Sequence, residues 1–171
     1  MRRVLLFLLG EPDRGDDAAA FLAADLLSSE ARSRAEIVPA GQLGPDSFVG
    51  LPRDAAVVIA DAVVGVPAGE LVTLPLAEIA TGAGPAPRSS HVMPLQQVLA
   101  LAEVLDGLPE GVFVGVGAAS FELGAGLSPA VAAALPSFAA AIEAEIERLA
   151  TPTALATPTA PATPTIRESH R

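Results

Sequence analysis

Four residues of this sequence carry side chains suited to bond cleavage or metal binding: the adjacent acids Asp16 and Asp17, the isolated acid Asp61, and His91. Two carboxylates and one imidazole that converge from separate loops would form a site with open coordination positions. Such a site suits a borderline divalent ion such as zinc or nickel. The ion would polarise a carbonyl group or activate a bound water for hydrolysis. Without a metal, two carboxylates could share the acid and base roles instead.

Each of these residues also has a purely structural interpretation. Asp61 interrupts an apolar stretch, where a buried carboxylate needs a cation or hydrogen-bond donors beside it, so it could brace a loop. His91 could simply begin a helix. Asp16 and Asp17 precede an expected helix, whose dipole and terminal N–H groups stabilise acids. No contiguous ligand motif is present, so a functional role depends on whether the fold brings these residues together.

The elements that would position these residues alternate between strands and helices. Apolar runs predict strands, and helical spacing with capping residues predicts helices. We expect strands at residues 3–9, 35–38, 55–60, 70–74 and 111–117, and helices at about 18–28, 94–105 and 128–149. Asp16 or Asp17 should cap the first helix, Ser128 should cap the last, and Pro136 should kink or interrupt that last helix.

This alternation predicts an α/β fold: a three-layer α/β/α domain with a mostly parallel sheet. Ligands of such sheets bind beyond the carboxyl ends of the strands. Asp16 and Asp17 follow the first strand, Asp61 is expected to end another, and His91 ends an irregular loop rich in Gly and Pro. The acids should therefore meet at one edge of the sheet.

Composition limits the other function classes. The chain has 171 residues, 51% of them apolar but only 4% aromatic, and it has no cysteine. This fits one domain with an aliphatic core and excludes disulfides and thiol catalysis. From Thr151 the Thr-Pro dipeptide recurs among alanines, which is typical of a low-complexity extension. We therefore expect a folded domain at 1–150 and a disordered tail at 151–171.

Charge and hydropathy narrow the partners and the location. The net charge is −10 and every basic residue is Arg, without the basic stripe of a nucleic-acid binder. The first apolar run, at residues 4–9, is shorter than the roughly 7–15 residues of a signal core. No stretch approaches the roughly 20 uninterrupted apolar residues of a membrane span. We expect a cytoplasmic protein that binds neither nucleic acid nor membrane, and nothing in the sequence demands more than a monomer.

Four segments resemble, in order, the motifs of the hydrogenase maturation endopeptidases. Residues 10–17 (Gly-Glu-Pro-Asp-Arg-Gly-Asp-Asp) look like the family's N-terminal Gly-Asn motif that ends in two acids. Ile59-Ala60-Asp61-Ala62 is similar to its second acidic motif, and Ser89-Ser90-His91 before Leu95 to its histidine motif. Gly126-Leu127-Ser128-Pro129 also matches in place. The resemblance covers about residues 3–150.

The resemblance implies an aspartyl-type α/β/α endopeptidase that trims the C-terminal extension of a nickel–iron hydrogenase large-subunit precursor. In that family cleavage follows nickel insertion, and the metal-contacting residues correspond to Asp17, Asp61 and His91 of this chain. The resemblance therefore implies that the precursor presents its own nickel to these three side chains. The expected partner is the large-subunit precursor, and the expected cofactor is the nickel that the precursor carries.

The chain also departs from the family pattern. Glu11 stands where the family usually has Asn, Leu8 replaces a common Gly, and residues 18–20 are all Ala where many relatives have Gly. The loop at 39–44 retains only Gly41 and Gly44 of a Gly-rich segment. These changes leave open an alternative: a catalytically idle assembly factor that binds a hydrogenase subunit or a related metalloprotein. A Rossmann-type nucleotide site is disfavoured because the Gly-x-Gly-x-x-Gly fingerprint is absent and the acids would repel a pyrophosphate.

Overall fold

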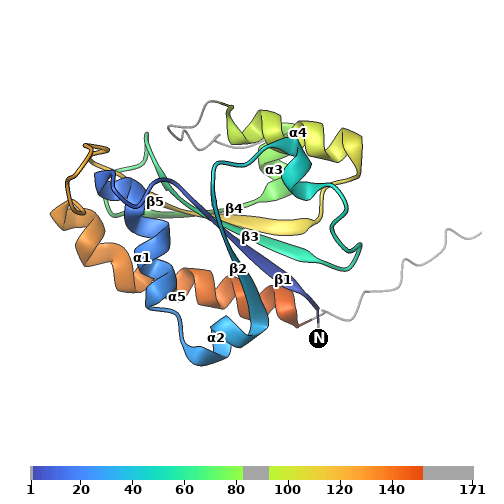
Figure 1. Ribbon diagram of the computed structural model, residues 1–171, viewed down its shortest axis with the longest axis horizontal. Helices are drawn as coiled ribbons and strands as arrows, with labels where there is room; N and C mark the ends of the chain where they lie inside the picture. Colours follow the sequence, from blue (N-terminus) through green and yellow to red (C-terminus); the bar gives the residue numbers. More distant parts are fainter. Residues whose placement is uncertain (1, 83–92, 152–171) are drawn as a thin grey trace, which may run out of the picture.

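The computed structural model describes residues 2–82 and 93–151, which contain a five-stranded sheet in the order β2-β1-β3-β5-β4 (Figure 1). The strands are β1 (Val4–Leu9), β2 (Ala35–Gly41), β3 (Ala56–Val63), β4 (Leu71–Pro75) and β5 (Glu110–Gly117). Four of them run parallel, and β4 pairs antiparallel with β5 at one edge. The predicted mostly parallel α/β sheet is confirmed.

Helices cover both faces of this sheet. One face carries α1 (Ala19–Asp25), α2 (Ser29–Arg34) and α5 (Pro129–Ala150). The other carries α3 (Leu76–Thr81), α4 (Leu95–Leu105) and the 3₁₀ helix η2 (Pro45–Phe48). In Figure 1 the α5 layer lies below the sheet and the α3–α4 layer above it. The domain therefore has the three layers expected from the sequence.

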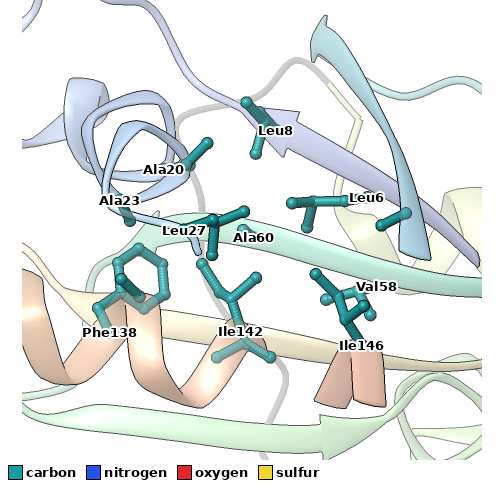
Figure 2. Packing of buried hydrophobic residues seen from close by; sticks show 14 of the residues in the cluster. Leu6, Leu8, Ala20, Ala23, Leu27, Val58, Ala60, Phe138, Ile142 and Ile146 are labelled. Atoms are coloured by element: carbon teal, nitrogen blue, oxygen red, sulfur yellow. The ribbon is translucent and has the colours of Figure 1, made fainter. Parts of the chain in front are cut away.

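Alternation along the strands divides the core into two apolar layers. On β1, Leu6 and Leu8 face the α5 layer, whereas Leu5 and Phe7 face the α4 layer. Figure 2 shows the first layer, where Phe138, Ile142 and Ile146 of α5 pack against Leu6, Val58 and Ala60 of the strands, with Ala20 and Ala23 of α1 beside them. The same alternation on β3 assigns the odd-numbered residues 57, 59 and 63 to the α4 layer.

The helix expected at 18–28 differs in the structure. A 3₁₀ helix, η1 (Gly15–Ala18), precedes α1, which already ends at Asp25. A separate helix, α2, then begins because the Ser28 hydroxyl accepts a hydrogen bond from Ala31 N at 3.2 Å. The expectation that Asp16 or Asp17 caps a helix is wrong: both acids lie inside η1, and neither η1 nor α1 has a side-chain cap.

Two strands are longer than predicted. β2 continues to Gly41, and β3 continues to Val63, so Asp61 does not end its strand. The ladder between β1 and β3 stops at the pair Leu8 and Ala60, while β3 stays paired with β5 from Asp61 to Val63. Asp61 is therefore the first residue of β3 beyond the end of its β1 ladder. Where β3 lies beside β1, the carboxyl-terminal edge of the sheet therefore still begins at Asp61.

The last helix is continuous. α5 includes Pro136 without interruption, because the side chains around it are anchored in the core: Val131 and Phe138 are fully buried on either side. Ser128 is its N-cap, as predicted, with its hydroxyl accepting from Val131 N. Among the described helices, α5 alone has the length and apolar composition of a membrane span. Its buried face lies on the sheet, and the core helix of a globular domain has the same properties.

Candidate active site

The first acidic side chain of the site, that of Asp17, is held by the turn after β1. Gly10 has a φ of +100°, and a Cβ at that position would collide with the Asp17 carbonyl oxygen. Glycine therefore permits the close approach of the two segments. The carboxylate of Asp17 accepts a hydrogen bond at Oδ2 from Glu11 N at 3.0 Å, and the residue is only 3% exposed. The contact uses a backbone amide, so it does not depend on the side chain at position 11.

The second, Asp61, lies inside β3 and is 1% exposed. Its Oδ1 accepts a hydrogen bond from Ala62 N at 2.8 Å. By strand alternation its side chain belongs to the face covered by α3 and α4. Its partner across the β3–β5 ladder is Gly115, where a Cβ would lie 2.7 Å from the Phe113 ring. The β5 position beside Asp61 therefore carries no side chain, and the Phe113 ring fills the space where a Cβ would lie.

The fold brings these two acids to the same edge of the sheet. η1, which carries Asp17, packs against β3, which carries Asp61. His91, the third predicted member, lies outside the described residues. Within residues 2–82 and 93–151, no three His, Asp or Glu side chains are close enough together to hold a metal ion. The structure thus places the two acids on elements in contact with each other, and their relation to the imidazole stays a prediction.

Asp16 occupies a different environment from its neighbour. It is fully buried, and its carboxylate accepts three backbone hydrogen bonds: from Ala119 N at 2.7 Å and Ser120 N at 3.0 Å to Oδ2, and from Ser128 N at 2.6 Å to Oδ1. Burial by itself raises the pKa of Asp16, but these amides and the Ser128 hydroxyl outweigh it and hold the pKa below its ordinary value. Asp16 is therefore ionised, and its hydrogen bonds connect η1 with the loop between β5 and α5.

Backbone hydrogen bonds reinforce that junction. Asp16 N donates to Ser120 O at 2.9 Å, Gly15 N to Ala125 O at 3.1 Å, and Gly124 N to Asp13 O at 2.7 Å. The loop before η1 and the loop between β5 and α5 therefore form one unit beside Asp17. Sequence reasoning missed this role, because the partners lie more than a hundred residues away and Gly126-Leu127-Ser128-Pro129 indicated only a helix start.

One surface hollow among the described residues lies away from these acids. It measures about 280 Å³ and lies at the amino-terminal edge of the sheet, between the segments that precede β3 and β5. Phe48, Arg53, Asp106 and Leu108 are among its lining residues. The Asp106 carboxylate there accepts a hydrogen bond from Gly50 N at 2.9 Å. The hollow is therefore separated by the length of the strands from Asp17 and Asp61.

Comparison with known proteins agrees with this geometry. The family model for "Hydrogenase maturation protease" (HycI) matches residues 22–145, a segment that includes Asp61 and begins after Asp17. The chain belongs to the hydrogenase maturation protease family. It is a divergent member of this family of endopeptidases, as the sequence motifs indicated. No protein with a curated function matches it by sequence alone.

Solved structures share the fold at low identity. The [NiFe] hydrogenase maturation protease HybD from Thermococcus kodakarensis is 27% identical, with a TM-score of 0.63 over 87% of this chain and 99% of that one. HycI from Thermococcus kodakarensis KOD1 is 24% identical, with a TM-score of 0.61 over 85% and 93% of the two chains. HybD from E. coli is 22% identical, with a TM-score of 0.63 over the same shares. The last two likenesses concern the fold alone.

Proposed function

We propose that this protease removes the C-terminal extension of a nickel–iron hydrogenase large-subunit precursor after nickel has been inserted. In this proposal the precursor presents its nickel to Asp17, Asp61 and His91. The observation that supports it is the placement of two buried carboxylates, from segments 44 residues apart in sequence, on adjacent elements at one edge of the sheet. Burying two acids is costly, so a fold that does so at its ligand edge favours a cationic partner.

The chemistry would be hydrolysis of one peptide bond. Asp17 and Asp61 would each have one carboxylate oxygen oriented by a backbone N–H and would use oxygen lone pairs toward the substrate's nickel. The His91 imidazole would supply nitrogen. The nickel would serve as the signal that the precursor is loaded, and as a Lewis acid at the scissile carbonyl or at the attacking water. In the metal-free alternative, one of the two acids would act as general acid and the other as general base in the hydrolysis.

A cleavage assay on the nickel-loaded precursor of the same organism tests the proposal. The wild type should release the C-terminal peptide, detected by mass, and Asp61→Ala should reduce the rate by at least about a hundredfold. His91→Ala and Asp17→Ala should behave alike. Asp25→Ala is the matched control, because Asp25 ends α1 with a mostly exposed side chain, and it should cut normally.

The alternative function predicts another outcome. If neither the wild type nor any variant cuts the precursor but all of them bind it, the chain is an assembly factor. Glu11 and the divergent Gly41 loop are the sequence features that favour this reading. In the structure, Glu11 still holds Asp17 through its backbone amide, and Gly41 O still accepts from Gly10 N at 2.9 Å. Both contacts are independent of the altered side chains, which supports the catalytic function.

Nickel dependence is tested separately. Purified precursor without nickel should be cut far more slowly than the loaded form, because the three side chains would lack the ion that they bind. Equal cleavage of both forms would eliminate nickel recognition and leave the metal-free, aspartyl-type route. We further propose that the protease works as a cytoplasmic monomer and consists of a folded domain at 1–150 and a tail at 151–171.

A further inference from the structure

Arg14 lies in the loop that places Asp17, and its guanidinium is incompletely satisfied. Its Nε is buried and has no hydrogen-bond partner among the described residues. A buried N–H without a partner costs free energy, because it has lost water and gained nothing in exchange. The side chain as a whole is 40% exposed, so the rest of the guanidinium reaches the surface. A ligand could therefore approach the group from outside.

An unpaired side-chain donor is unusual among the arginines that the structure describes. Five of the seven donate to protein acceptors: Arg2 to Asp54 O and Glu110, Arg3 to Glu36, Arg32 to Leu27 O and Ala24 O, Arg34 to Glu30, and Arg148 to Glu145. Only the side chains of Arg14 and Arg53 make no hydrogen bond within the described part of the chain. Arg53 is exposed and lines the hollow at the opposite edge, so its donors are not buried. Arg14 alone combines a buried donor with a place beside the candidate active site.

The nearest acid does not complete the coordination of Arg14. Glu11 Oε2 lies 3.9 Å from Arg14 Nη1, which is beyond hydrogen-bond length, and the Glu11 side chain is 57% exposed. The backbone is fixed, since Arg14 N donates to Glu11 O at 3.2 Å and Arg14 O accepts from Asp17 N at 3.1 Å. The loop therefore fixes the backbone from which the guanidinium extends, while Nε stays without a hydrogen-bond partner among the described residues.

Charge identifies the ligand class. In the described loops at this edge, residues 10–18, 64–70 and 118–128, Arg14 is the one cation, among the acids Glu11, Asp13, Asp16, Asp17, Glu70 and Glu122. Within these described loops, the acids would repel an anionic group of a substrate, and Arg14 would attract it. The two Nη groups of a guanidinium are parallel donors that match the two oxygens of a carboxylate, and they belong to the part of Arg14 that reaches the surface.

We propose that Arg14 binds a carboxylate in the C-terminal segment of the precursor and thereby helps to select the substrate. This rests on the proposed function for the identity of the precursor. The carboxylate belongs either to an Asp or Glu side chain of the segment or to its C-terminal α-carboxyl group. Both sources present the same two oxygens to the guanidinium, and the two are separated by experiment.

Binding of a fluorescent peptide provides the test, and it does not require cleavage. The peptide spans the cleavage site and the C-terminal extension. Arg14→Gln should weaken its binding by about five- to tenfold, Arg14→Lys by less, and Arg53→Gln, the matched control, not at all. An amidated peptide and a peptide with Asp and Glu changed to Asn and Gln identify the carboxylate. One of these two modified peptides should bind the wild type more weakly than the native peptide does. The affinity of that peptide should show no further loss with Arg14→Gln.

A structural role for Arg14 gives different results. Because Nε makes no hydrogen bond, Arg14→Gln should keep the melting temperature of the wild type; a lower one with unchanged peptide binding would overturn the inference. Equal losses of binding affinity with Arg14→Gln for the native and the neutralised peptides would also overturn the inference. The absence of saturable peptide binding by the wild type would overturn it as well. Failure of cleavage together with binding that depends on Arg14 would instead count against the proposed function alone and leave the inference standing.

Discussion

At the scale of single residues, the neighbours Asp16 and Asp17 have carboxylates that face different groups. Asp17 lies over the turn at Gly10, where one backbone amide holds it. Asp16 lies beneath the loop between β5 and α5, where three amides hold it. Because each amide hydrogen bond favours the ionised acid, Asp16 remains charged although it is fully buried. We therefore assign Asp16 a structural role, and the proposed role at the site stays with Asp17.

This division predicts a stability effect for Asp16→Asn. The amide would keep one acceptor oxygen and would place an NH₂ donor against backbone N–H groups, which leaves at least one of them unpaired. The free energy of unfolding should fall by about 2–4 kcal/mol in urea denaturation. Asp13→Asn, in the same loop with an exposed side chain, is the control and should change it by less than about 0.5 kcal/mol. A loss of similar size in both variants would contradict the role assigned to Asp16.

Sequence reasoning proposed the ligand residues of this site and missed what supports Asp17 and Asp61. Asp61 was identifiable because a charge in an apolar strand is conspicuous. The bonds from Asp16 to Ala119, Ser120 and Ser128 were not, because they span 103 to 112 residues and no local pattern encodes them. Arg14 was also missed, since its unpaired Nε is a property of packing and not of sequence spacing.

At the scale of elements, the strands were predictable because a sheet covered on both faces needs continuous apolar runs. The five expected strands all occur, in the sheet order β2-β1-β3-β5-β4. Boundaries were less predictable. The strand β3 was expected to stop at Asp61, yet pairing with β5 carries it to Val63. The helices α2 and α3 were missed because each has only six residues, too few to show a helical period.

The contact between α5 and the sheet provides the next prediction. Phe138 is fully buried and lies in the same core layer as Leu6 and Ala60, near Ala23 of α1 (Figure 2). Phe138→Ala would leave a cavity there and should lower the free energy of unfolding by about 3–5 kcal/mol. Val104→Ala, on the outer face of α4 where Val104 is 83% exposed, should cost less than about 0.5 kcal/mol. Equal effects in urea denaturation would mean that α5 does not pack as described.

At the scale of the whole molecule, the charge of −10 and the acids of the carboxyl edge favour a cationic or metal-bearing partner over a nucleic acid. The site lies at one edge of the sheet, and α5 ends near the opposite one, where Arg2 N donates to Ala150 O at 3.3 Å. The start of β1 and the end of α5 are therefore joined away from Asp17 and Asp61. A segment attached beyond α5 begins at the end of the molecule remote from the chemistry.

That arrangement predicts how a chain ending at Thr151 behaves. The helix is complete by this point, with Leu149 and Ala150 buried and Thr151 N donating to Glu147 O at 3.2 Å. The residues removed are mostly Thr, Pro and Ala, a composition that buries little apolar surface. The shortened chain should keep the melting temperature of the full chain within about 2 °C and cut the nickel-loaded precursor at the same rate.

A melting temperature lower by more than about 5 °C would mean that the segment packs on the domain. An unchanged melting temperature with slower cleavage would instead place the segment in precursor binding.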